Sequence, residues 1–327
     1  MSTTILEVKE LKVGISTDDQ EIHIVNGVNF SLGKGEVLGI VGESGCGKSL
    51  TSLSLMNLLP PGVKRQSGDI IVNSKNFSEN SKKQWREVRG KKLAMIFQEP
   101  MSSLNPVYKI GHQISEMILN HEEMTKKQAR LRALEMLKLV GIPRPEQVLD
   151  EYPHQLSGGM RQRVMIAMAL SCNPEVLIAD EPTTALDVTI QAQILELIKD
   201  IQSKLEMSVI LITHDLGVVA ETCDRVIVMY AGEVVENSQI NELFDAPKHP
   251  YTQGLLNSLP DIETQKEYLE SIPGVVPAPG EMPVGCRFAP RCKFAHDRCS
   301  IEPPTIQVNE NSQVKCWLYA NEEGGVK

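Results

Sequence analysis

Short apolar stretches alternate along the chain with segments whose apolar residues recur at helical spacing. Each apolar stretch is about as long as a strand, and most are rich in β-branched residues. These stretches are Val37–Val41, Leu93–Phe97, Val176–Ala179, Val209–Ile212 and Val226–Tyr230. The helical patterns are Ser49–Leu59, Gly159–Leu170 and Thr189–Leu205. This alternation predicts an α/β fold with a mainly parallel sheet that helices cover.

Residues 99–160 interrupt the alternation. They begin with the turn-rich stretch Glu99–Pro106 and continue with helical patterns at Ile110–Asn120 and Lys126–Val140. This order predicts a helical insertion between two strands of the core.

A second change in composition comes late in the chain. Ten of the 19 prolines lie in the stretch 247–304, and no long periodic segment follows Leu269. We therefore expect residues 271–327 to be a small loop-rich appendage that needs cross-links to hold its shape. The expected regions are residues 1–246, with a helical subdomain at about 99–160, and residues 247–327.

Charge and hydropathy narrow the class of protein. The chain has 327 residues and a formal net charge of −9, which argues against a general affinity for DNA or anionic lipid but allows one small phosphate site. No apolar run approaches the roughly 18–20 residues that span a bilayer. The N-terminus lacks a basic-then-apolar signal pattern. We expect a cytosolic protein whose membrane role, if it has one, depends on a partner.

The segment Gly42–Ser49, GESGCGKS, fits the phosphate-loop pattern G-x-x-x-x-G-K-[ST] and lies between a predicted strand and a predicted helix. Its glycines allow backbone N–H groups to surround a β-phosphate, and the helix start adds a positive dipole end. Lys48 is expected to reach the β- and γ-phosphates and Ser49 to bind Mg²⁺. The structural alternative is a tight strand–turn–helix with small residues for packing. The candidate nucleotide-binding residues are Gly42, Ser44, Gly45, Cys46, Gly47, Lys48, Ser49 and Leu50.

Two adjacent carboxylates, Asp180 and Glu181, follow the apolar run Val176–Ala179. Open α/β sheets bind ligands at the carboxyl ends of their strands. Asp180 is expected to hold Mg²⁺, and Glu181 to accept a proton from the attacking water as the catalytic base. The alternative is a solvated strand end.

The segment Leu156–Arg163, LSGGMRQR, resembles the signature of the ABC-transporter ATPase family, and the resemblance covers roughly residues 5–245. It implies an ABC ATPase fold in which two chains sandwich ATP, with the signature of each chain on the γ-phosphate bound by the other. It also implies that Gln98 senses Mg²⁺ and the membrane domain, and that His214 contacts the γ-phosphate. From the residues alone, two structural interpretations remain as alternatives: Ser157 as a helix N-cap and His214 as a buried, hydrogen-bonded histidine. The residues that the resemblance assigns to nucleotide are Gln98, Ser157, Gly158, Gly159, Asp180, Asp187 in the stretch Ala185–Asp187, and the catalytic His214, with Ser49, Gln98 and Asp180 at Mg²⁺.

Three further segments resemble the ATP-binding subunits of oligopeptide, dipeptide and nickel importers. They are Gln98–Pro106, His249–Thr252 and Gly285–Cys292. The resemblance is closer to the D-type subunit, whose signature typically ends in methionine, as at Met160. It implies a second ATP-binding subunit, often a different F-type chain, two permease subunits and an extracytoplasmic substrate-binding protein. The expected location is peripheral, on the cytoplasmic face of the cell membrane.

The sequence departs from the family pattern at the adenine contact, which is usually an aromatic residue before the phosphate loop. No Phe, Trp or Tyr precedes Phe30. The equivalent position is near Ile15, with Ile22 and His23 as neighbouring candidates. We expect weaker or less base-selective ATP binding, because base–aromatic stacking contributes about 1–3 kcal/mol in nucleic-acid complexes.

Four of the seven cysteines gather near the C-terminus with the spacing C-x5-C-x6-C-x16-C. No close C-x2-C pair typical of structural zinc sites occurs among them, so four thiolates on irregular loops favour a [4Fe–4S] cluster. Zinc, free thiols or disulfides are the alternatives, and His296 lies between the ligands. The resemblance also points to a cluster. The candidate ligands are Cys286, Cys292, Cys299 and Cys316; Cys46, Cys172 and Cys223 are expected only to pack.

Together these patterns predict an ATPase subunit that powers the import of di- or oligopeptides. Import of nickel or a metal chelate by the same kind of complex is the alternative. A soluble ABC ATPase acting on DNA is disfavoured because the phosphate loop and the signature lie close in sequence, without sustained heptads between them. A redox sensor is disfavoured because Lys48, Asp180, Glu181 and His214 are all present.

Overall fold

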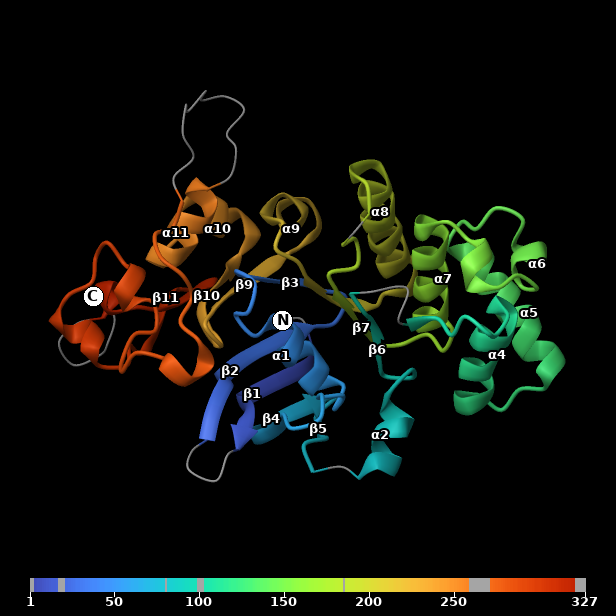
Figure 1. The fold of residues 1–327 in the computed structure, drawn as a ribbon, viewed down its shortest axis with the longest axis horizontal. Coiled ribbons are helices and arrows are strands. Elements are labelled where there is room, and N and C mark those ends of the chain that lie inside the picture. Colours follow the sequence, from blue (N-terminus) through green and yellow to red (C-terminus); the bar gives the residue numbers. More distant parts are fainter. Residues whose placement is uncertain are drawn as a thin grey trace. The chain divides into compact units, whose positions relative to one another are not determined.

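A computed structural model describes residues 3–16, 21–79, 81–98, 103–184, 186–258 and 271–320. The chain folds into two compact units, each built from separate stretches of sequence (Figure 1). The first unit comprises Met1–Leu6, Leu32–Val37 and Val72–Ile212. The second comprises Glu7–Ser31, Leu38–Ile71 and Thr213–Lys327.

Three parallel strands form the centre of the first unit: β6 (Leu93–Ile96), β7 (Val176–Asp180) and β8 (Ser208–Ile212). Every residue of these strands is buried. Their continuous apolar sequence is therefore that of parallel strands covered on both faces. The helix α8 (Val188–Leu205) carries the chain from β7 to β8, as the alternation predicts.

Helices fill most of the rest of the first unit. The largest group is α4 (Ile110–His121), α5 (Lys126–Leu139), the short α6 (Pro145–Val148) and α7 (Gly158–Leu170), and α5 packs on both α4 and α7 (Figure 1). The helix α5 starts at a capping box in which Thr125 and Gln128 satisfy each other's backbone N–H groups. The predicted insertion is thus helical. The unit also contains α2 (Lys82–Val88), the two-residue strand β5 (Lys75–Asn76) and the turn η1 (Pro153–Gln155).

Three long strands that the apolar runs did not predict lie mainly in the second unit: β1 (Thr4–Ser16), β2 (Glu21–Gly33) and β4 (Lys64–Val72), in the order β2-β1-β4. In β1 the fully buried side chains alternate along the strand, as Leu6 and Val8 and then as Leu11 and Val13. The alternation shifts by one residue at Glu10, whose φ is 47°. This break hides the two-residue period that marks a strand.

The second unit also contains a mixed sheet. The strand β3 (Val37–Val41) runs parallel to β9 (Arg225–Tyr230), and β10 (Glu233–Gln239) returns antiparallel to β9. The hairpin β11 (Thr305–Asn309) and β12 (Ser312–Lys315) then adds to the free edge of β10.

This hairpin gives regular structure to part of the region that the sequence predicts to be loop-rich. Its strands are only five and four residues long, and a buried cluster of Ile306, Val314 and Ala320 holds them. Such short alternating runs are too brief to stand out in a sequence. From residue 271 to residue 304 the chain does consist of loops and 3₁₀ turns, as expected.

Short helices complete the second unit. They are α1 (Lys48–Leu55), α9 (Leu216–Thr222), α10 (Ile240–Asp245), α11 (Pro250–Asn257) and the turns η2 (Pro279–Glu281), η3 (Ala289–Arg291), η4 (Asp297–Ser300) and η5 (Trp317–Tyr319). No helix in the described ranges is both long enough and apolar enough to cross a lipid bilayer.

Candidate functional site

The phosphate loop connects β3 to α1 in the second unit and brings together all the residues predicted there, Gly42 to Leu50. Gly47 caps α1 with a left-handed φ of 101°. Gly42 has a φ of 152°, and a Cβ at this position would stand 2.2 Å from the carbonyl oxygen of Met229. Only glycine fits both positions, so the motif's glycines are required by the backbone path.

Lys48 lies buried against its own loop. Its Nζ donates hydrogen bonds to the carbonyl oxygens of Gly42, at 2.7 Å, and Glu43, at 3.0 Å. Cys46 is fully buried beneath the loop, and burial raises the pKa of its thiol. The Cys46 thiol is therefore neutral and enclosed. This fits the packing role that the sequence predicts. Cys172 and Cys223 are buried as well.

Glu43 is held in place by residues that the sequence analysis quoted in motifs but gave no role. Its backbone N–H donates to the Tyr251 hydroxyl at 2.8 Å. Its carboxylate accepts two hydrogen bonds from the Arg291 guanidinium, at 2.7 and 3.1 Å. These bonds raise the pKa of Arg291 further above its ordinary value. Tyr251 and Arg291 lie in the motifs His249–Thr252 and Gly285–Cys292, which the sequence analysis identified. Nothing in the sequence shows that they contact Glu43.

The two adjacent carboxylates end β7 in the first unit. Asp180 is buried as the last residue of the strand. Glu181 follows with a φ of 46°, in the left-handed region that non-glycine residues seldom occupy. Its Oε2 accepts hydrogen bonds from Gln98 Nε2 and Thr184 Oγ1, both at 2.8 Å. The structure therefore joins Gln98 and Glu181, two predicted site residues 83 positions apart.

The signature residues begin α7. Ser157 is the exposed N-cap, and its Oγ accepts a bond from the Met160 N–H at 3.4 Å. A Cβ on Gly158 would meet only Leu186, at 3.8 Å, whereas a Cβ on Gly159 would stand 3.0 Å from Ile190 Cγ2. Gly159 thus lets the starts of α7 and α8 approach each other, and Gly158 stays exposed.

Asp187 and His214 are also exposed. Asp187 caps α8, since its Oδ1 accepts a bond from the Ile190 N–H at 2.9 Å. His214 lies in the second unit, just before α9. This position excludes the buried structural histidine that the sequence left open. Ala185, at the start of the predicted Ala185–Asp187 motif, lies outside the described residues.

The adenine candidates lie on β1 and β2. Ile15 is partly exposed near the end of β1, and His23 Nδ1 is 2.6 Å from Gln66 Oε1 on β4. His23 therefore already has a polar partner. The expectation of weaker adenine binding stays a prediction.

Cys286, Cys292, Cys299 and Cys316 line one small cavity together with His249 and His296. All four are free thiols, half-buried, and His296 Nδ1 is 3.4 Å from Cys299 Sγ. Burial, together with the nearby Cys286, Cys292 and Cys299, raises the pKa of Cys316 to about 11. The space between the side chains measures about 10 Å³, the room of one water molecule. Among the residues that the structure describes, no three His, Cys, Asp or Glu side chains converge as ligands of a single metal ion.

Comparisons with known proteins agree with this arrangement. Residues 25–184 match the ABC transporter family, and residues 235–299 match the oligopeptide/dipeptide transporter C-terminal region. The oligopeptide transport ATP-binding protein AppD of Bacillus subtilis is 53% identical over 98% of both chains. The dipeptide transport ATP-binding protein DppD of Escherichia coli is 48% identical, also over 98% of both. 

Solved structures show the same fold. The dimeric ATP-binding cassette MJ0796, in a post-hydrolysis state with ADP and Pi, has a TM-score of 0.65 and 28% identity, and the match covers 72% of this chain and 99% of the cassette. The part not covered is of the size expected if the C-terminal region is additional to the cassette. From its motifs, fold and near-full-length similarity, the chain belongs to the ABC transporter ATPases, in the family of oligopeptide and dipeptide transport ATP-binding proteins.

Proposed function

We propose that this chain binds and hydrolyses Mg-ATP to power the import of di- or oligopeptides through a membrane transporter. The observation that carries the proposal is the near-full-length similarity to peptide-transport ATP-binding proteins, with the nucleotide motifs and the C-terminal region in the same order. The contacts of Glu181 support hydrolysis, because Gln98 and Thr184 fix the carboxylate that would take a proton from water. The relatives described above are peptide-transport proteins, and this similarity does not favour nickel import.

The working ATPase is expected to be a dimer of cassettes. Ser157 and Gly158 are exposed at the N-terminus of the 13-residue helix α7, where backbone N–H groups favour an anion. Such an exposed site suits the γ-phosphate of ATP bound by another chain, and the MJ0796 cassette is dimeric. We propose an F-type chain as the second subunit, two permeases, and a binding protein outside the membrane. This assembly places the chain on the cytoplasmic face. The roles of Ser49, Gln98 and Asp180 at Mg²⁺ stay predictions.

The experiment that tests this function is peptide uptake by vesicles that contain the chain, its partner ATPase and the permeases, with the binding protein added. Uptake of a labelled peptide should require ATP and should stop with Lys48→Ala. A parallel assay with a nickel chelate should show no uptake. Nickel uptake without peptide uptake would overturn the assignment of the substrate class.

A permease-contact surface is proposed beside the Gln98–Pro106 motif. Residues 99–102 lie outside the described residues, but the stretch that follows exposes Val107, at 70%, and Tyr108, at 47%. Gln113 fixes this stretch by accepting from the Asn105 N–H at 2.9 Å and donating to the Asn105 and Tyr108 carbonyl oxygens. Two exposed apolar side chains on a fixed loop suit a protein partner.

Substitution of both Val107 and Tyr108 by serine should reduce transport more than basal ATP hydrolysis, because the surface contacts the permease and not the nucleotide. Leu131→Ser, at an equally exposed apolar position on α5, is the matched control. Both rates are measured in the same vesicles. Equal losses of transport and hydrolysis would indicate a folding defect instead.

For the four-cysteine pocket we propose a [4Fe–4S] cluster held by Cys286, Cys292, Cys299 and Cys316. Its support is that four free thiols from separate loops line one cavity. A four-iron cluster offers each thiolate its own iron, so the sulfurs stand farther apart than around one zinc ion. The 10 Å³ space is smaller than a cluster, and the cysteine side chains must turn outward to admit one.

Metal analysis of anaerobically purified protein tests the cluster. The expected result is iron with broad visible absorption, and Cys286→Ser should lose both. One zinc and no iron would replace the cluster by a zinc site. Absence of either metal, with the region 271–320 resistant to protease, would overturn the metal site altogether.

A further inference from the structure

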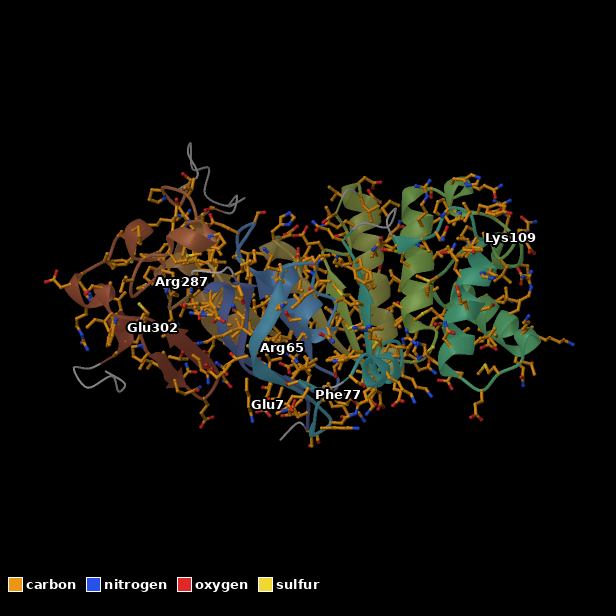
Figure 2. All side chains as sticks on the ribbon, turned by 60° about the horizontal axis from the view of Figure 1, so that its bottom comes forward. Glu7, Arg65, Phe77, Lys109, Arg287 and Glu302 are labelled. Carbon is orange, nitrogen blue, oxygen red and sulfur yellow. The ribbon has the colours of Figure 1, made fainter. Side chains whose placement is uncertain are left out.

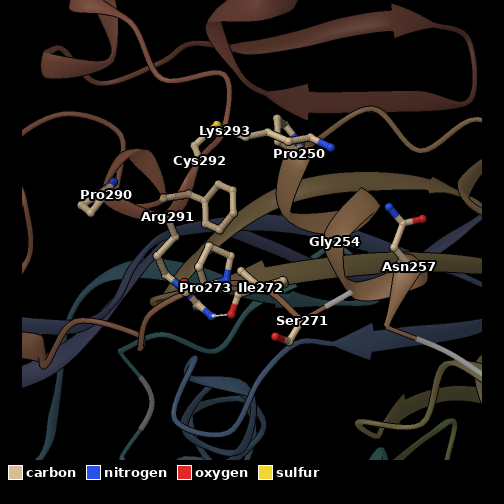
Figure 3. A pocket seen from close by; sticks show the side chains of 11 residues that line it. Pro250, Gly254, Asn257, Ser271, Ile272, Pro273, Pro290, Arg291, Cys292 and Lys293 are labelled. Carbon is tan, nitrogen blue, oxygen red and sulfur yellow. Dashed lines mark hydrogen bonds between the residues drawn. The ribbon is translucent and has the colours of Figure 1, made fainter. Parts of the chain in front are cut away.

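The segment Arg287–Cys292 joins two of the pocket's cysteines to the phosphate loop. Arg291, next to Cys292, is almost fully buried and uses its whole guanidinium. Besides its two bonds to Glu43, its Nε donates to the Pro273 carbonyl oxygen at 2.8 Å, and its planar group lies over the Tyr230 ring. Figure 3 shows Arg291 reaching down from the segment beside Ile272 and Pro273. The Arg291 side chain is therefore held by contacts other than its bonds to Glu43 of the phosphate loop.

On the loop side, Glu43 receives three independent contacts. Arg291 binds its carboxylate, Tyr251 accepts its N–H, and Lys48 Nζ donates to its carbonyl oxygen at 3.0 Å. Lys48 is the side chain expected to meet the phosphates. One residue thus connects the cysteine segment to the lysine of the nucleotide site.

Arg287, which is labelled in Figure 2, lies at the other end of the segment and makes a second connection. Its Nε is 3.1 Å from Glu233 Oε1, and its NH1 donates to the Ala231 carbonyl oxygen. The next residue, Gly232, donates its N–H to the Cys46 carbonyl oxygen within the phosphate loop, at 2.9 Å. Both arginines of the segment are therefore linked to the loop, one directly and one through residues 231–232.

Charge gives the Arg291 contact a specific consequence. Glu43 places a negatively charged carboxylate in the loop that is expected to bind the negatively charged triphosphate of ATP. Like charges within one loop repel each other. Arg291 neutralises the carboxylate through a bidentate pair. Without the arginine, Glu43 would oppose ATP.

We propose that Arg291 is a positioning residue for ATP: it neutralises and holds Glu43, so that the order of the four-cysteine pocket sets the affinity of the phosphate loop. This inference rests on the nucleotide site proposed above. It extends that site to a structural input from the C-terminal region, because Cys292, which lines the pocket, is the neighbour of Arg291 in sequence.

The test is the Kd of Mg-ATP, measured on the purified full chain with a fluorescent ATP analogue and competing ATP. Arg291→Ala should raise the Kd about tenfold, the size of effect that one unpaired charge near a ligand produces. Glu43→Gln alone should change it little. The double variant should recover most of the loss, because no unpaired carboxylate remains. In the assembled transporter the Arg291→Ala defect should appear in the KM for ATP rather than in kcat.

Arg298→Ala is the matched control, since Arg298 stands next to Cys299 and lies 4.2 Å from the centre of the Trp317 ring. It should leave the Kd unchanged. Cys292→Ser should weaken ATP binding in the same direction as Arg291→Ala and increase protease cleavage within 271–320. If Arg291→Ala fails to fold, Arg291→Gln, which keeps a long polar side chain but loses the charge, takes its place and should again be rescued by Glu43→Gln.

A wild-type Kd for Arg291→Ala overturns the proposal, and so does a double variant as weak as the single one. Lys48→Ala separates this failure from failure of the nucleotide site. If Lys48→Ala abolishes binding while Arg291→Ala has no effect, only the positioning role is wrong. If Lys48→Ala also binds normally, the phosphate site itself is wrongly assigned.

Discussion

At the scale of single residues, Glu181 has the most constrained conformation among the predicted site residues of the first unit. Its left-handed backbone is held because its N–H donates to the Ile212 carbonyl oxygen at 2.9 Å while its carboxylate accepts from Gln98 and Thr184. A non-glycine residue in this region costs about 1–3 kcal/mol. The proposed role of Glu181 as the base rests on the two hydrogen bonds that hold its carboxylate.

Replacing Glu181 by glutamine should leave Mg-ATP binding intact and lower steady-state hydrolysis by about 10²–10⁴-fold, because the amide keeps the shape but cannot take a proton. The exposed Glu196 on α8 gives the matched control, Glu196→Gln, with normal hydrolysis. Both activities are measured on the reconstituted transporter. Near-normal turnover by Glu181→Gln would assign the base elsewhere.

At the scale of elements, the two neighbouring glycines at the start of α7 have different surroundings. Gly158 has room for a methyl group, whereas Gly159 is pressed against Ile190 of α8. We therefore expect Gly158 to be needed for nucleotide binding and Gly159 to be needed for the packing of α7 on α8.

Gly158→Ala should keep the Tm of the protein but lower ATP hydrolysis, because its methyl group enters the exposed face expected to receive phosphate. Gly159→Ala should lower stability by about 1–3 kcal/mol through overpacking, and Ile190→Ala should relieve it. Thermal unfolding and hydrolysis are measured on all variants. A Gly158→Ala protein with full hydrolysis would contradict a phosphate contact at this helix start.

The elements also show what the sequence could and could not predict. The strands around Ile178 and Ile210 are continuously apolar, and the helices are long and periodic, so both were predictable. The strand β1 was missed because its period slips at Glu10. The ion pair of Glu43 with Arg291 joins residues 248 positions apart. Neither partner lies in a periodic pattern, so nothing in one sequence pairs them.

At the scale of the whole molecule, the C-terminal hairpin β11–β12 is part of the sheet that contains β10. Glu236, Asn237 and Ser238 of β10 pair with β12. The buried Glu233 bridges Lys315, at 2.8 Å, and Arg287. The region is therefore held by backbone pairing and buried charges in addition to its cysteines.

A chain that ends at Pro304 should aggregate, because it exposes the edge of β10 and removes Lys315 from Glu233, a break that costs about 3–5 kcal/mol for buried pairs. A chain that ends at Ala320 keeps every described strand and should stay soluble. Full-length Cys316→Ser controls for the lost cysteine. Light scattering and thermal unfolding give the readout, and a soluble Pro304 chain with unchanged Tm would show that the hairpin is dispensable.

The distance in sequence between Glu43 and Arg291 has a consequence for biosynthesis. During translation at about 5–20 residues per second, the phosphate loop leaves the ribosome roughly 10–50 s before its arginine. Until then no arginine neutralises Glu43, so under the proposed role of Arg291 the nascent loop has about tenfold lower affinity for ATP than the finished protein. The full affinity of the phosphate loop then develops only after residue 291 has emerged from the ribosome and docked.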